Sequence, residues 1–191
     1  MLKNVPPLIL ASKSPRRQDL LRLMGFDFRI VLKEVDETYP ETLQPSEIAV
    51  YVSEKKAKAF DEIISDEIVI TADTIVSIDN HILGKPENEQ HAFDILSKLS
   101  GHTHQVLTGV SLLRHHHLKS FYEVSDVTFG NLTKEQIGYY ISTGQPMDKA
   151  GAYGIQEWIG LIGITRINGS YTNVVGLPTE RLYKELIDFI H

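Results

Sequence analysis

The chain has 191 residues with a hydrophobic fraction of 42% and a charged fraction of 23%, as in an ordinary globular protein. Its formal net charge of −6 argues against a general nucleic-acid-binding role, because that charge would repel DNA and RNA. The absence of cysteine excludes disulfides, thiolate metal sites and a cysteine nucleophile. Since no apolar run is long enough for a bilayer and the N-terminus lacks signal-peptide features, we expect a cytoplasmic protein with no membrane partner.

The N-terminal part predicts a strand followed by a helix. Leu8 to Ala11 is a short apolar run typical of a buried strand. Ser14 suits a helix N-cap and Pro15 the first helical position, where a missing N–H costs nothing. Helically spaced apolar residues follow and are closed by a glycine: Leu20, Leu21, Leu23, Met24 and Gly25.

Two arginines, Arg16 and Arg17, therefore fall in the first turn of that helix. A helix N-terminus carries partial positive charge, so cations there are unfavourable unless an anion joins them. A phosphate held by the arginines and the hydroxyls of Ser12 and Ser14 would explain the pattern. The alternative is a solvated arginine pair on a surface helix.

The next elements are a predicted strand over 26–32, an acidic loop over 34–40 that contains Glu37, and a helix beginning at Pro45. The inward positions of this helix include Ile48, Ala49, Val52, Ala57 and Phe60. We interpret Lys55 and Lys58 as solvated. Lys56 shares a face with Val52, four residues earlier, so a lysine facing a cleft and a solvated lysine both remain open.

Residues 66–78 form the most continuous apolar segment and predict a central strand buried on both faces. Asp73 interrupts this segment. A buried carboxylate is costly unless it is paired, hydrogen-bonded or bound to a metal. A structural salt bridge or cap is the alternative, but costly buried charge clusters at functional sites, and we favour a functional Asp73.

A turn at Asp79–Asn80, a short return strand over 81–83 and a tight Gly84–Lys85–Pro86 exit follow. We then expect a helix over 88–99 that ends at Gly101. Two long strands are predicted over 103–113 and 118–129. They are joined by the segment Arg114 to His117, whose adjacent histidines we interpret as a solvated turn rather than a metal site.

Thr133 and Gln136 form a capping box that begins a helix running to about Ser142. The glycine-punctuated segment 148–156 predicts a polar loop that contacts a ligand. A strand over 161–167, a turn over 168–172 and a last helix over 179–190 complete the chain. Without a repeat or linker, the sequence predicts a single α/β or α+β unit with a mixed sheet.

These residues together describe an anion pocket with one or two carboxylates. Phosphate and carboxylates in one site imply a divalent metal, because Mg²⁺ is usually held by one or two carboxylates and the oxygens of the substrate. The P-loop signature, the Gly-x-Gly-x-x-Gly dinucleotide fingerprint and the Gly-x-Ser-x-Gly elbow are absent from the sequence.

Six ordered motifs covering nearly the whole chain resemble the Maf family of nucleoside triphosphate pyrophosphatases. They are Ser-Lys-Ser-Pro-Arg-Arg (12–17), Ala-Asp-Thr-Ile-Val (72–76), Gly-Lys-Pro (84–86), Leu-Ser-Gly-His-Thr-His-Gln-Val-Leu-Thr-Gly (99–109), Asp-Lys-Ala-Gly-Ala-Tyr-Gly-Ile-Gln (148–156), and Asn-Gly-Ser-Tyr with Val-Gly-Leu-Pro (168–178). The resemblance implies an α/β fold related to the inosine triphosphatases. An elongated mixed β-sheet with flanking helices would form two lobes around a cleft, in one domain over residues 1–191.

The same resemblance implies hydrolysis of a nucleoside triphosphate to the monophosphate and pyrophosphate with Mg²⁺, Mn²⁺ or Co²⁺, and it suggests a homodimer. By position, Asp73 matches the proton acceptor, and Glu37 the additional acidic residue, which we place with Asp73 at the metal. The phosphate side is matched by Ser12, Ser14, Arg16, Arg17, Lys56 and Lys85. Arg16, Thr74 and Gln156 match positions linked to base selection.

The motif over 148–156 resembles the branch acting on dTTP and UTP rather than the branch preferring 7-methyl-GTP. One departure is Glu157–Trp158–Ile159, where the family commonly has small residues; Trp158 there would reshape the base pocket or a subunit contact. We expect water, activated by Asp73 and metal, to attack the α-phosphorus. The alternatives are house-cleaning of modified purine triphosphates such as ITP or XTP, and a cell-division regulatory role through partner binding.

Overall fold

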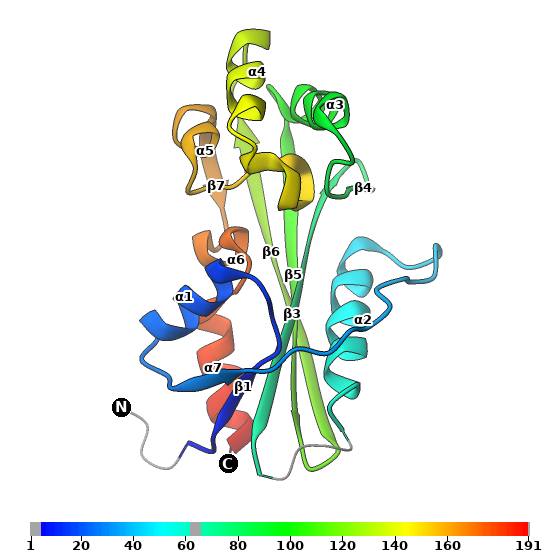
Figure 1. The fold of residues 1–191 in the computed structure, drawn as a ribbon, viewed down its shortest axis with the longest axis vertical. Coiled ribbons are helices and arrows are strands. Elements are labelled where there is room, and N and C mark those ends of the chain that lie inside the picture. The colour runs from blue at the N-terminus through cyan, green and yellow to red at the C-terminus, as the bar shows by residue number, and fades with distance from the viewer. Residues whose placement is uncertain (1–4, 62–65, 191) are drawn as a thin grey trace. The chain divides into compact units, whose positions relative to one another are not determined.

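The computed structural model describes residues 5–61 and 66–190, in which helices and strands alternate along most of the chain (Figure 1). The elements in order are β1 (Leu8–Leu10), α1 (Pro15–Leu23), β2 (Phe28–Ile30), α2 (Pro45–Lys58), β3 (Ile68–Ile78), β4 (His81–Leu83), α3 (Glu89–Leu99), β5 (Thr103–Arg114), β6 (His117–Phe129), α4 (Lys134–Ser142), η1 (Gln145–Asp148), η2 (Ala150–Ala152), α5 (Trp158–Gly163), β7 (Ile164–Asn168), α6 (Tyr171–Val175) and α7 (Thr179–Ile190).

The strands of the described residues form one seven-stranded sheet in the order β2-β1-β3-β5-β6-β7, with β4 paired to β3. β1 is parallel to both β2 and β3, whereas β4 is antiparallel to β3 and β7 is antiparallel to β6. The sheet is therefore mixed and carries flanking helices, which confirms the predicted fold class.

The chain divides into two compact units. The first contains Met1–Asp73, Thr108–Glu123 and Gly176–His191, and the second contains Thr74–Leu107 and Val124–Val175. Because the boundaries fall inside β3, β5 and β6, each of these strands contributes residues to both units. A single domain over the whole chain and a cleft stay predictions.

In the first unit, the alternation of side chains along β1 divides the core between two faces. Leu8 and Leu10 pack in a cluster with residues of α1 and α7, whereas Ile9 packs in a second cluster with Ala57 of α2. Helices α1 and α7 therefore cover one face of these strands and α2 covers the other (Figure 1). Every side chain of β1 is buried, which is why this strand has a continuous apolar sequence.

The second unit has its own core, built on α3 and α4 and the strands they cover. Ala92, Ile95, Leu96 and Leu99 of α3 are buried, and Asn88 caps that helix by accepting a hydrogen bond from the His91 amide. Ala152, Tyr153 and Ile155 belong to the same cluster. The segment 148–156, predicted as a polar loop that contacts a ligand, therefore packs largely into the core, and its contact with a ligand stays a prediction.

The prediction of a strand over 161–167 is also wrong in its first half. Helix α5 extends to Gly163 and β7 begins at Ile164. Gly160 permits this helical turn, since a Cβ there would lie 2.2 Å from the carbonyl oxygen of Ile155. Leu161 is 76% exposed and Ile162 44% exposed, so the two apolar side chains in this first half lie on the surface.

Three smaller expectations also need correction. The strand predicted over 26–32 contains only Phe28–Ile30, and the turn predicted over 168–172 runs into α6 at Tyr171. Leu23, one of the helically spaced apolar residues that predicted α1, is 83% exposed. Within residues 5–61 and 66–190, no helix combines the length and the hydropathy that crossing a membrane requires.

Candidate functional site

The corner between β1 and α1 has the predicted local structure. Ser14 occupies the N-cap with extended backbone angles, Pro15 takes the first helical position, and Arg16 and Arg17 lie in the first turn. The Ser14 amide donates a 3.3 Å hydrogen bond to Ser12 Oγ, while the Ser14 side chain makes no capping bond. Both arginines are only partly exposed, which argues against a fully solvated pair.

Arg17 is tied to two parts of the first unit. Its Nη1 donates to Ser12 Oγ at 3.3 Å, and its Nε donates to the Gly176 carbonyl at 2.8 Å. Burial is the main reason that the pKa of Arg17 lies below its usual value, while the carboxylates of Asp73 and Glu37 act in the opposite direction. The guanidinium thus lies in the electrostatic field of both predicted acidic residues.

Helix α2 delivers Lys56 to the same region. The helix packs so closely on β5 that a Cβ at Gly109 would lie 2.2 Å from the carbonyl oxygen of Ala49. Lys56 Nζ forms ion pairs with Asp73 Oδ1 at 2.8 Å and with Glu37 Oε1 at 3.1 Å. The side chain of Lys56 is 16% exposed and that of Asp73 is 17% exposed.

The geometry therefore supports the interpretation of Lys56 as a lysine of the site and separates it from its neighbours. Lys58, with 62% of its side chain exposed, pairs along the helix with Glu54, as expected for a solvated face. Lys55 pairs with the exposed Asp36.

The two carboxylates have the chemistry that a divalent metal needs. Hard cations prefer carboxylate oxygens, and Mg²⁺ uses one or two of them together with substrate phosphates. Asp73 and Glu37 both reach one ammonium group, so they are close enough to share one cation. In the described part of the chain, no group of three or more His, Asp or Glu side chains could hold a metal, so water or substrate oxygens would complete the coordination beside Asp73 and Glu37.

The remaining predicted site residues belong to the second unit. Thr74 is partly buried in β3, and Lys85 is exposed in the segment after β4. The Gly84 carbonyl, next to Lys85, accepts a 3.1 Å hydrogen bond from the Gly151 amide. Gln156 is exposed.

A family model described as Maf-like protein matches residues 7–189. This chain belongs to the Maf family. A protein from Phocaeicola vulgatus, named dTTP/UTP pyrophosphatase, is 52% identical over 190 residues, which cover 97% of this chain and 98% of the relative. A protein of the same name from Flavobacterium psychrophilum is 50% identical over 182 residues, covering 95% of this chain and 93% of the relative.

Solved structures with the same fold include two Ham1 proteins. The one from Staphylococcus aureus has a TM-score of 0.52 at 17% identity and covers 97% of this chain and 100% of its own. The one from Coxiella burnetii has a TM-score of 0.54 at 12% identity, with coverages of 95% and 98%. At these identities the likeness establishes the fold of this Maf-family chain and nothing about its substrate.

A buried polar cluster, for which no role was predicted, surrounds the Maf motif over 148–156. Lys149, within this motif, pairs with Glu157 at 2.9 Å, and the hydroxyl of Tyr140 donates to the other oxygen of Glu157. The one available signal was Glu157 itself, a carboxylate directly after the motif. Trp158, which follows it, packs its ring against Tyr139 with a centroid separation of 4.8 Å, and both rings are exposed.

A second buried polar residue, His104, lies in the core of the second unit. Its Nε2 lies 2.8 Å from the Tyr153 hydroxyl, and its ring stacks on Phe129. Burial lowers the pKa of His104 to about 4. This histidine is therefore neutral at ordinary pH.

The histidines between β5 and β6 lie in a turn, as predicted. His115 and His116 have positive φ angles of 47° and 62°. Exposed carboxylates partner both of them: His115 lies 3.3 Å from Asp66, and His116 lies 2.9 Å from Asp61.

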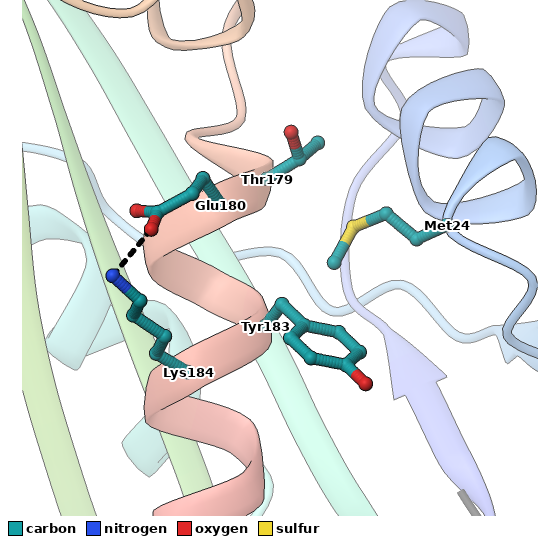
Figure 2. A pocket seen from close by; sticks show the side chains of 5 residues that line it. All are labelled: Met24, Thr179, Glu180, Tyr183 and Lys184. Atoms are coloured by element: carbon teal, nitrogen blue, oxygen red, sulfur yellow. Dashed lines mark ion pairs between the residues drawn. The ribbon is translucent and has the colours of Figure 1, made fainter. Parts of the chain in front are cut away.

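A separate pocket opens on the first unit, between the C-cap of α1 and the start of α7. Figure 2 shows its lining, which consists of Met24, Thr179, Glu180, Tyr183 and Lys184. Glu180 and Lys184 neutralise each other as an ion pair one helical turn apart. None of the predicted site residues lines this pocket, so it carries no part of the proposed chemistry.

Proposed function

We propose that this protein hydrolyses dTTP and UTP to the monophosphate and pyrophosphate. The observation that carries the proposal is the largely buried Asp73 carboxylate, which lies 2.8 Å from the Lys56 ammonium and in the field of Arg17. An acid beside several fixed cations suits water activation next to a polyphosphate. The relatives named dTTP/UTP pyrophosphatase, at 50% and 52% identity, support the substrate.

In the proposed reaction, Asp73 accepts a proton from a water molecule as the oxygen of that water forms a bond to the α-phosphorus. The bond from the α-phosphorus to the bridging oxygen breaks, and pyrophosphate leaves with the bonding electron pair. The phosphate-side residues neutralise the triphosphate and the charge that develops on the leaving group: Ser12, Ser14, Arg16, Arg17, Lys56 and Lys85.

We propose Glu37 and Asp73 as the residues that hold a divalent metal, Mg²⁺, Mn²⁺ or Co²⁺. When bound, such a metal lowers the pKa of a coordinated water and balances phosphate charge. Glu37 suits a role that begins with substrate binding, because its side chain is 59% exposed and belongs to a segment without regular structure. Base selection is assigned to Arg16, Thr74 and Gln156.

The test is a substrate panel of dTTP, UTP, CTP, ITP, XTP and 7-methyl-GTP with Mg²⁺ or Mn²⁺, in which pyrophosphate and orthophosphate are measured separately. We expect pyrophosphate from dTTP and UTP at the highest kcat/KM. Orthophosphate as the sole product would contradict attack at the α-phosphorus, and a preference for ITP or XTP would favour house-cleaning of modified purines. The homodimer, the cytoplasmic location and the absence of a nucleic-acid partner stay predictions.

A further inference from the structure

Gln156 lies in a tight turn that presents it to solvent. The Glu157 amide donates a 3.0 Å hydrogen bond to the Gly154 carbonyl, which closes a four-residue turn with Ile155 and Gln156 at its centre. Ile155 is 6% exposed and packs in the core of the second unit, whereas Gln156 is exposed. The turn thus anchors one central side chain and leaves the other available to a ligand.

Tyr140 of α4 holds both ends of this turn. Its hydroxyl accepts a 3.2 Å hydrogen bond from the Gly154 amide and donates one to Glu157 Oε2. Tyr140 is fully buried, and its burial and the adjacent Glu157 raise the pKa of its hydroxyl, which therefore stays protonated as a donor. A single hydroxyl group connects the first and last residues of the turn.

Lys149 completes the network from the other side. Its side chain is 7% exposed, and its ammonium donates to Glu157 Oε1 at 2.9 Å, to Asp148 Oδ1 at 2.6 Å and to the Gln145 carbonyl. An ammonium has three N–H donors, so all of them have acceptors. Both oxygens of Glu157 are likewise occupied, one by Lys149 and the other by Tyr140.

The Glu157 carboxylate lies directly against the turn, with no space between them. A Cβ at Gly154 would approach the carboxyl carbon of Glu157 to 2.6 Å. A lysine, a glutamate and a tyrosine are costly to bury together, but a fully satisfied buried polar network can fix one conformation. The conformation that this network fixes is that of the turn carrying Gln156.

We infer that Tyr140, Lys149 and Glu157 are positioning residues that hold Gln156 for discrimination among pyrimidine bases. The inference rests on the proposed function and extends it. Uracil and thymine present an N–H donor at N3 beside a carbonyl acceptor, and a carboxamide can pair with both groups. Cytosine presents the opposite pattern, with an acceptor at N3 and an amino donor. An amide held at a fixed position favours one pattern, whereas a loosely held amide can adapt to either.

The test compares kcat/KM for dTTP and dCTP in Tyr140→Phe and Glu157→Gln variants. We expect the dTTP preference to fall about tenfold, mainly through a higher KM for dTTP, because the chemistry at Asp73 is unchanged. Tyr139→Phe is the matched control: Tyr139 lies in the same helix and is 57% exposed, and its replacement should leave the preference unaltered. If Glu157→Gln does not fold, Tyr140→Phe decides the question.

A double-mutant cycle separates positioning from general destabilisation. Gln156→Ala should itself reduce the dTTP preference, and Tyr140→Phe should reduce it no further in that background. An additive effect, or equal losses for dTTP and dCTP, would overturn the inference.

Amide hydrogen exchange tests the same network without any turnover. Tyr140→Phe should accelerate exchange at Gly154 at least about tenfold relative to Tyr139→Phe. Unchanged exchange would overturn the positioning role. A protein that exchanges as expected but hydrolyses neither dTTP nor UTP would instead refute the proposed function.

Discussion

Lys56 of α2 and Asp73 of β3 form an ion pair of 2.8 Å in which neither side chain is more than 17% exposed. Glu37 joins the same ammonium at 3.1 Å. The lysine thus compensates the cost of keeping a carboxylate inside a largely buried strand. In the proposed reaction the ammonium gains a second kind of partner, the triphosphate, and Asp73 and Glu37 would hold a divalent metal.

Replacement of Asp73 by asparagine should abolish most turnover. The amide keeps the size of the side chain but cannot accept a proton from water, and loss of a general base typically costs about 10²- to 10⁴-fold in rate. Steady-state assays of pyrophosphate release check the effect, and circular dichroism checks the fold. Asp94→Asn, a change of an exposed aspartate on α3, is the control and should retain activity. Turnover near that of the unmodified protein in Asp73→Asn would contradict the role of the carboxylate.

Lys56→Met should strengthen metal binding while it weakens catalysis. Removing the ammonium leaves Asp73 and Glu37 without their shared cation, so Mn²⁺ should bind the nucleotide-free protein more tightly than it binds the unmodified protein. The free energy of unfolding without metal should fall by about 1–3 kcal/mol, because a partly buried carboxylate loses its partner. Calorimetric titration with Mn²⁺ and urea unfolding measure the two effects.

Lys58→Met provides the comparison for that variant. This lysine is in the same helix, and its pair with Glu54 is a surface pair, worth at most about 1 kcal/mol. We expect neither a change in Mn²⁺ affinity nor a loss of turnover. Weaker Mn²⁺ binding by Lys56→Met would argue against a metal between Glu37 and Asp73.

The buried His104 should make stability depend on pH. Burial lowers the pKa of His104 from its usual 6.5 to about 4, so between these values the unfolded chain binds a proton that the folded protein does not. The contribution of the neutral His104 to the free energy of unfolding is therefore fully present above pH 6.5, and it is lost as the pH falls through 4. From pH 7 to pH 5 the free energy of unfolding should fall by about 2 kcal/mol on account of this residue.

Urea unfolding of the unmodified protein and of His104→Gln at both pH values isolates that contribution. Glutamine can still hydrogen-bond the Tyr153 hydroxyl but has no proton to gain. The free energy of unfolding of His104→Gln should therefore fall by about 2 kcal/mol less between pH 7 and pH 5 than that of the unmodified protein. If the free energy of unfolding changed with pH in parallel for the two proteins, the pKa of His104 would be the same in the folded and unfolded states, which would contradict this prediction.

Replacing Gly109 or Gly138 by alanine should change the free energy of unfolding in opposite directions. Gly109→Ala places a Cβ 2.2 Å from the backbone oxygen of Ala49, which cannot move without shifting α2 and its Lys56. We expect a loss of about 1–3 kcal/mol or more in the free energy of unfolding, together with reduced turnover. Gly138 of α4 has open space around its Cβ position, so Gly138→Ala should stabilise the protein by about 0.5–1 kcal/mol. Thermal and urea unfolding compare both variants with the parent protein.

The local sequence determined several elements of this protein. Ser14 and Pro15 predict the start of α1, and the Thr133–Gln136 capping box predicts the start of α4, because these signals act within one helical turn. The continuous apolar run of β3 predicts a strand buried on both faces, and Asp73 stands out because its charge contradicts that environment. The Maf motifs predicted the family that the family model then matched.

Tertiary structure decided which side chains form ion pairs and which side chains are buried. Helical spacing left Lys56 open as either a cleft or a solvated lysine, and the placement of α2 against β5 and β3 brings its ammonium to Asp73. The segment 148–156 has the composition of a surface loop, yet its small residues pack into the core and leave Gln156 outside. Helix α5 has a strand-like apolar sequence, but its side chains Leu161 and Ile162 are exposed. Short-range signals fix where elements begin, whereas burial, ion pairing and the order of strands depend on residues distant in the chain.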